Sequence, residues 1–127
     1  MIKPRILIVD DEPAFIRLLS LVLERTGRYS VRQESEATRA VAVAEDFHPD
    51  LIVLDFIMPR TDGLSIAQQL RSDPQFSEVP IIFLSATVLN TTDGNPTIGG
   101  FPAYTKPIGV ADLLKAIDRH LAAAQCN

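Results

Sequence analysis

The stretch "LIVLDFIMPRTDG", residues 51–63, places one carboxylate, Asp55, directly after a run of apolar residues. A near-continuous run rich in Val, Ile and Leu is typical of a strand that is covered on both faces of a parallel sheet. The Met-Pro and Asp-Gly pairs that follow both favour a turn. The stretch therefore predicts a buried strand that ends in a sharp bend and delivers one acidic group to the edge of the sheet.

Similar apolar runs recur along the chain and alternate with helical patterns. This alternation predicts parallel strands joined by right-handed crossovers, with helices on both faces of the sheet. The run at 29–33 alternates apolar and polar residues, as an edge strand does. The predicted strands are 5–10, 29–33, 51–55, 80–85 and 103–106, and the predicted helices are 13–26, 36–47, 63–73 and 109–124.

These elements predict an α/β fold, a flavodoxin-like, doubly wound sheet of five parallel strands in the order 2-1-3-4-5. Because no linker or repeat divides the chain, residues 1–127 are expected to form a single domain with a core of about 4–124 and no output domain. The segment 88–100 should contain the fourth helix, yet Gly94, Gly99 and Gly100 each disfavour a helix by about 1 kcal/mol and Pro96 by about 3. We therefore expect the fourth helix to be short, irregular or missing, and a loop with at most one helical turn in its place.

The composition indicates the class of protein and excludes two kinds of partner. The chain is 46% hydrophobic and 22% charged, which is the balance of a globular domain. The net charge is −4 and no block of Lys and Arg occurs, so neither nucleic acid nor a membrane surface is expected as a partner. Because Cys126 stands alone and no secretory segment begins the chain, a cytoplasmic location is expected.

Three carboxylates follow strands that should be neighbours in the sheet. Asp10 and Asp11 come after the first strand and Asp55 ends the third, so the three groups are expected to meet at one edge. Two such charges about 4 Å apart repel by about 4 kcal/mol at an effective dielectric near 20. A hard divalent cation with oxygen ligands relieves this repulsion, and the pattern predicts Mg²⁺.

Two further strand ends supply a hydroxyl, Ser85, and an ammonium group, Lys106. Together with the acids they provide what phosphoryl transfer to a carboxylate requires. Asp55 is the predicted nucleophile, Lys106 and the metal neutralise the phosphoryl oxygens, and Ser85 holds one of them. The turn after Asp55 is expected to offer the Ile57 backbone carbonyl to the metal.

The segments "ILIVDDEP", "PDLIVLDFIMPRTDG", "PIIFLSA" and "YTKPI", spread over residues 5–108, together resemble the receiver domain of two-component response regulators, of the single-domain chemotaxis type. The resemblance implies that Asp55 accepts a phosphoryl group from a histidine kinase or a histidine phosphotransfer protein. It implies that Asp11, Asp55 and the Ile57 carbonyl bind Mg²⁺ directly, while Asp10 acts mainly through water. A receiver is not an enzyme beyond promoting its own phosphorylation and dephosphorylation, and it signals by conformational change to a partner protein, here unknown.

One position departs from the family pattern. Receivers usually carry Phe or Tyr three residues before the lysine, and this chain has Ala103 there, with Tyr104 one place later. Tyr104 or Phe101 could replace the switch aromatic, although alternation along a strand puts Tyr104 on the opposite face. By the same resemblance, Ile57 and Thr87 influence the water that hydrolyses the phosphoryl group, and Tyr104 and Thr87 are predicted to be modulating residues.

Other interpretations of these residues compete with this one. Asp10 and Asp11 could simply favour the start of a helix, but that role leaves Asp55 and Lys106 unexplained. A pseudo-receiver, which binds partners without phosphate, usually lacks one of the key residues, and none is missing here. An aspartate-nucleophile phosphohydrolase would need a second carboxylate where the chain reads "DFI", and a flavodoxin-like cofactor binder would not place "DDEPAF" in its phosphate loop. His48 and His120 have no second ligand at metal spacing and are expected at the surface.

Overall fold

A computed structural model describes residues 3–58, 61–86, 91–92, 95–106 and 108–125. Thr87 lies outside these described residues. Among the helices of the described residues, none has the length and apolar character that a membrane span requires. The elements in chain order are β1 (Arg5–Val9), α1 (Pro13–Arg25), β2 (Ser30–Glu34), η1 (Ala37–Arg39), α2 (Ala40–Phe47), β3 (Leu51–Asp55), β4 (Ile57–Met58), β5 (Thr61–Asp62), α3 (Gly63–Arg71), β6 (Ile81–Ser85), β7 (Thr91–Thr92), β8 (Asn95–Ile98), β9 (Phe101–Thr105) and α4 (Val110–Gln125).

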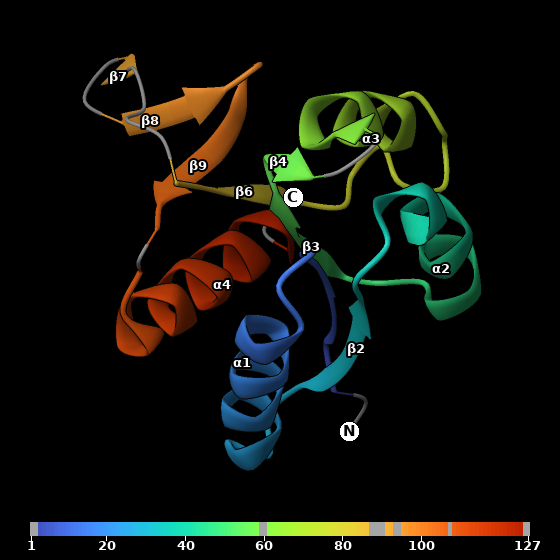
Figure 1. Ribbon diagram of the computed structural model, residues 1–127. Coiled ribbons are helices and arrows are strands. Elements are labelled where there is room, and N and C mark those ends of the chain that lie inside the picture. The colour runs from blue at the N-terminus through green and yellow to red at the C-terminus, as the bar shows by residue number, and fades with distance from the viewer. Residues whose placement is uncertain (1–2, 59–60, 87–90, 93–94, 107, 126–127) are drawn as a thin grey trace.

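The main sheet has the strand order β2-β1-β3-β6-β9-β8-β7 (Figure 1). Its first five strands pair in parallel, with Val9 of β1 opposite Leu54 of β3 and Asp55 of β3 opposite Leu84 of β6. This is the predicted 2-1-3-4-5 arrangement, and β2 lies at the edge as its alternating sequence indicated. The register brings the carboxyl ends of β1, β3, β6 and β9 to one edge of the sheet.

Helices cover both faces of this sheet, α1 and α4 on one face and α2 and α3 on the other (Figure 1). Successive side chains of a strand point to opposite faces, so β3 divides its apolar residues between two cores. Ile52 and Leu54 belong to the cluster with α2 and α3, whereas Leu51 and Val53 belong to the cluster with α1 and α4. Every residue of β3 and β6 is buried, which explains their continuous apolar sequences.

The segment expected to be a loop is partly an antiparallel ribbon. Among its described residues, β7 pairs with β8, and β8 pairs with β9 through Thr97 opposite Pro102 and Ile98 opposite Phe101. The absence of a helix from these residues agrees with the prediction, but the expectation of an irregular loop is wrong for β7 and β8. Gly99 and Gly100 have φ values of 56° and 88°. Two such residues suit a two-residue hairpin turn, because that turn needs positive φ at both central positions.

The ribbon also changes the last parallel strand. β9 begins at Phe101 rather than at residue 103, since its first residues pair with β8. The predicted helix 36–47 divides into the 3₁₀ turn η1 and the α-helix α2. These differences leave the positions of the strand ends that carry the acidic residues unchanged.

Candidate phosphoacceptor and metal site

Asp55 is fixed by the backbone on both sides of it. It ends β3 and is 6% exposed. The next residue, Phe56, donates its N–H to the Leu84 carbonyl at 2.9 Å and accepts a hydrogen bond from the Gly63 N–H at 2.7 Å. The chain therefore turns back immediately after Asp55, and the carboxylate is held at the edge of the sheet.

The Asp-Gly pair that follows has two structural roles. Asp62 caps α3 by accepting a hydrogen bond from the Ser65 N–H at 2.7 Å. A Cβ added at Gly63 would lie 2.4 Å from the Asp55 backbone oxygen and 2.9 Å from Phe83 Cε1. Only glycine lets α3 start this close to the residue that carries the acidic group.

Asp10, Asp11 and Asp55 come together as predicted. Each offers a carboxylate oxygen, and these oxygens all lie within 4.8 Å of one another. Asp10 is buried and Asp11 is exposed. Burial, followed by the charge of Asp10, raises the pKa of Asp55 from 3.8 to about 7; Lys106 opposes this shift, and Asp11 adds to it. Such a site favours a proton or a cation on its carboxylates.

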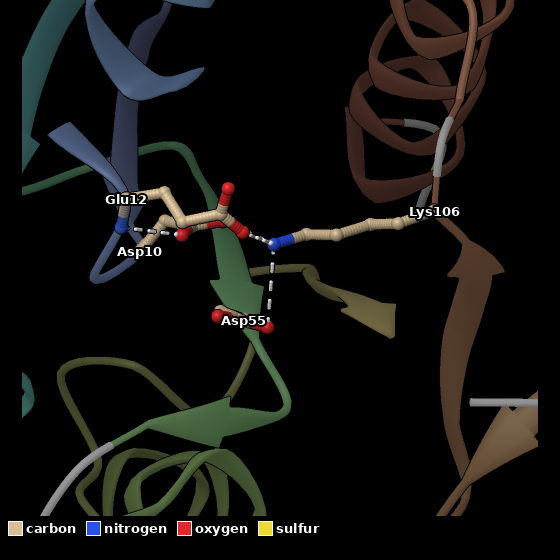
Figure 2. A network of polar contacts seen from close by, with 4 residues as sticks. All are labelled: Asp10, Glu12, Asp55 and Lys106. Carbon is tan, nitrogen blue, oxygen red and sulfur yellow. Dashed lines mark hydrogen bonds and ion pairs between the residues drawn. The ribbon is translucent and has the colours of Figure 1, made fainter. Parts of the chain in front are cut away.

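Lys106 follows β9 and reaches across to the acids (Figure 2). Its Nζ lies 2.8 Å from Asp10 Oδ2, 3.3 Å from Glu12 Oε1 and 3.6 Å from Asp55 Oδ1. Burial lowers the pKa of Lys106, but the hydrogen bond and charge of Asp10, with Asp55 and Glu12, outweigh burial and raise it. The ammonium group therefore stays charged beside Asp55.

Ser85 and Lys106 are connected through the backbone. Ser85 ends β6 and is 1% exposed. The Lys106 N–H donates to the Ser85 carbonyl at 2.7 Å, which ties the ends of β6 and β9 together. This bond fixes both strand ends beside β3.

Glu12 is the residue at this edge that the sequence reasoning missed. It directly follows the Asp10-Asp11 pair, and this adjacency is the signal that could have included it. Its carboxylate contacts Lys106, but its side chain is 65% exposed. The site therefore has a fourth acidic group on its solvent side.

Of the other predicted residues, Ala103 and Tyr104 lie on opposite faces of β9. The Ile57 side chain is 60% exposed. Tyr104 packs on the face covered by α1 and α4, where its hydroxyl lies 2.9 Å from His120 Nε2 and accepts a hydrogen bond from Arg119 at 2.9 Å. Ala103 is buried on the opposite face, in the cluster with α2 and α3. The different faces of Ala103 and Tyr104 follow from the alternation of side chains along β9.

Phe101 shares the face of Ala103. Its ring packs edge to face on Phe83 with centroids 5.7 Å apart, and Phe83 packs in the same way on Phe56 at 5.9 Å. An aromatic row thus runs from the residue after Asp55 to the start of β9. His48 is exposed as predicted, whereas His120 is only partly exposed, because its ring lies against Tyr104.

The family of the chain follows from comparison with known proteins. The model of the response regulator receiver domain matches residues 6–118. The chain belongs to this family. Asp10, Asp11 and Asp55 form the acidic pocket of this receiver domain, of the kind that binds magnesium. Receiver domains act as phosphoacceptors in two-component signalling and are not enzymes in the ordinary sense, and a histidine kinase is the kind of partner that the family implies.

Relatives of this receiver domain include a protein about twice as long as this chain and one of nearly the same length. It is 36% identical over 116 residues to the DNA-binding dual master transcriptional regulator RpaA of Synechocystis, and the match covers 90% of this chain but 47% of RpaA. It is 29% identical over 120 residues to the polar-differentiation response regulator DivK of Brucella ovis, covering 94% of this chain and 97% of DivK. The chain thus spans about half the length of RpaA and nearly all of DivK.

The fold of this receiver domain also matches a solved structure. The CheY-like receiver domain protein from Methanospirillum hungatei aligns with a TM-score of 0.83 over 98% of each chain. The two sequences are 23% identical, so this likeness concerns the fold.

Proposed function

We propose that Asp55 is the phosphoacceptor of this receiver domain and that it takes a phosphoryl group from a histidine kinase or a histidine phosphotransfer protein. The observation that carries the proposal is the position of Lys106 Nζ, 3.6 Å from Asp55 Oδ1 and 2.8 Å from Asp10 Oδ2. It puts a fixed positive charge beside the nucleophile, where the phosphoryl oxygens would arrive.

The acidic residues suit magnesium in a specific way. Asp10 Oδ1 accepts the Glu12 N–H at 2.9 Å and Asp10 Oδ2 accepts Lys106 Nζ at 2.8 Å, so both its oxygens have protein partners. Asp11 and Asp55 are therefore the better direct ligands, together with the Ile57 carbonyl, while Asp10 acts through water. When bound, Mg²⁺ supplies positive charge that favours the ionised carboxylates and neutralises phosphoryl oxygens.

The residues of the chain carry out the transfer in defined roles. An oxygen of the ionised Asp55 carboxylate attacks phosphorus, a new P–O bond forms, the P–N bond to the donor histidine breaks, and the imidazole leaves with the bonding electrons. Lys106 binds one phosphoryl oxygen and the Ser85 hydroxyl donates to another. The change is then passed to a partner protein through the elements that contact these strand ends.

Mass mapping after incubation with a small phosphodonor tests the proposal. The protein is treated with acetyl phosphate and Mg²⁺, and a parallel sample contains a chelator. We expect one modified residue, Asp55, label that depends on Mg²⁺, and loss of the label in Asp55→Asn. Label on another residue, or labelling that survives in Asp55→Asn, would overturn the proposal, and no labelling at all would favour a scaffold without phosphorylation.

A further inference from the structure

Glu12 places a negative charge on the solvent side of the acidic pocket. Its Oε1 lies 3.3 Å from Lys106 Nζ, and its side chain is 65% exposed. Asp10, which contacts the same ammonium group, is 1% exposed. Figure 2 shows Glu12 and Asp10 reaching the Lys106 ammonium group together, with Asp55 below them. A molecule that approaches Asp55 from solvent therefore meets the Glu12 charge before it meets that of Asp10.

Two contacts tie Glu12 to the site. The backbone N–H of Glu12 donates to Asp10 Oδ1 at 2.9 Å, which fixes the turn between β1 and α1. The side chain is attracted by Lys106, whose own backbone is bonded to Ser85 at 2.7 Å. Glu12 thus differs from an ordinary surface glutamate, because both its backbone and its carboxylate are tied to groups of the site.

We propose that Glu12 is a specificity-determining residue that selects phosphodonors by their charge. Its carboxylate disfavours small free donors with two negative charges, and so limits phosphorylation of Asp55 by metabolites compared with transfer from a protein. This inference rests on the proposed function of Asp55. A protein donor can offset the repulsion with contacts elsewhere on its surface, whereas a small donor has only the phosphoryl group to bind with.

Two small donors separate the effect of charge from the chemistry of transfer. Acetyl phosphate carries two negative charges at neutral pH, while phosphoramidate carries a net single charge because its nitrogen is protonated. With either donor an Asp55 oxygen forms the new bond to phosphorus. The bond that breaks is P–O in acetyl phosphate, which releases acetate, and P–N in phosphoramidate, which releases ammonia.

The test compares rates of Asp55 labelling in Glu12→Gln and in the unaltered protein, each at saturating Mg²⁺. We expect Glu12→Gln to raise the ratio of the acetyl phosphate rate to the phosphoramidate rate by about three- to tenfold at low ionic strength. The gain should shrink in high salt, because Glu12 is exposed and its field is screened. Glu12→Asp, which keeps the charge, should retain the original ratio.

A second readout does not depend on phosphorylation. In the metal-free protein, the NMR signal of the Lys106 ammonium group should shift in Glu12→Gln if the two side chains are in contact. Glu45→Gln removes the same charge from an exposed position on α2 and serves as the matched control for both measurements. It should change neither the donor ratio nor the Lys106 signal.

The outcomes separate this inference from the proposed function. Labelling of Asp55 with an unchanged donor ratio in Glu12→Gln overturns the role of Glu12 and leaves the phosphoacceptor intact. An equal change in Glu45→Gln also overturns it, since net charge would then suffice. Absence of Asp55 labelling with both donors overturns the proposed function and the inference with it.

Discussion

At the scale of single residues, the pocket holds more negative than positive charge. Asp10, Asp11, Asp55 and Glu12 gather where the described residues place one ammonium group, Lys106. The pKa of Asp55 is raised to about 7 by its burial, and the charges of Asp10 and Asp11 add to the shift. In the metal-free protein the ionised pocket therefore opposes folding, and cations or protons relieve that opposition.

This predicts how Asp55→Asn changes stability with pH. Because the pKa of Asp55 is raised from 3.8 to about 7 on folding, the folded protein holds this proton more tightly than the unfolded chain does. The stabilisation is complete below pH 3.8 and is lost as the pH rises to about 7. Without metal, Asp55→Asn should become more stable than the unaltered protein as the pH rises across this range. The difference in unfolding free energy should reach about 1–2 kcal/mol at neutral pH after solvent screening.

Urea unfolding in chelator at several pH values between 4 and 8 measures this difference. Glu45→Gln controls for the removal of a surface charge on α2. A difference between Asp55→Asn and the unaltered protein that stays constant or narrows as the pH rises would contradict the assignment.

Ile57 offers a second prediction at the residue scale. Its side chain is 60% exposed two residues beyond Asp55, so it can be replaced without disturbing a core. An aliphatic group offers the hydrolytic water no hydrogen bond, whereas Asn would. If that bond contributes about 1 kcal/mol in the transition state, Ile57→Asn should speed dephosphorylation about fivefold. Decay of the phosphorylated protein checks this, with Leu21→Asn on α1 as an exposed control; an unchanged or slower decay in Ile57→Asn would refute it.

At the scale of elements, the turn from β3 into α3 determines how Asp55 is presented. β4 and β5 form a short antiparallel pair, and Gly63 then brings the start of α3 against the backbone of Asp55. The contact is between backbone atoms, so neither partner can move aside as a flexible side chain would. The position of the phosphoacceptor therefore depends on a residue that has no chemistry of its own.

Gly63→Ala should accordingly damage both fold and function. The added Cβ would lie 2.4 Å from the Asp55 oxygen, so the start of α3 or the end of β3 must shift. We expect a loss of about 1–3 kcal/mol in unfolding free energy, together with slower Asp55 labelling. Gly109→Ala is the matched control, because the nearest atom to its Cβ would be Asp112 Oδ2 at 3.5 Å. Urea unfolding and labelling rates measure both effects, and equal behaviour of the two variants would contradict the prediction.

At the scale of the whole molecule, two cores on opposite faces of one sheet hold the pocket between them. β3 and β6 are buried on both faces, so the ends that carry Asp55 and Ser85 have little freedom to separate. The repulsion between the acids is thus retained in the folded protein instead of being relieved by movement. A cation that binds the folded pocket should stabilise the whole domain.

Magnesium should therefore raise the unfolding free energy by mass action. At a concentration ten times the dissociation constant, the gain is about 1.4 kcal/mol if the unfolded chain does not bind the ion. Thermal unfolding over a series of Mg²⁺ concentrations measures it, and Asp11→Asn should lose most of the gain. Asp46→Asn, on the exposed side of α2, should keep it. Equal gains in both variants would argue against Asp11 as a ligand.

The sequence by itself determined the parallel order of five strands and the meeting of Asp10, Asp11, Asp55 and Lys106. Both follow from local patterns, since buried strands have continuous apolar runs and parallel strands end at one edge. It also excluded a helix from the described residues of 91–100, because glycine and proline disfavour helices whatever surrounds them.

The tertiary structure alone decided what such local patterns leave open. A polar, glycine-rich segment became the strands β7 and β8 because the edge of β9 offered hydrogen-bond partners and Gly99-Gly100 could form the turn. Glu12 joined the site because its carboxylate can reach Lys106, which follows β9 at the far end of the chain. Both depend on partners remote in the sequence, and no pattern within either segment specifies them.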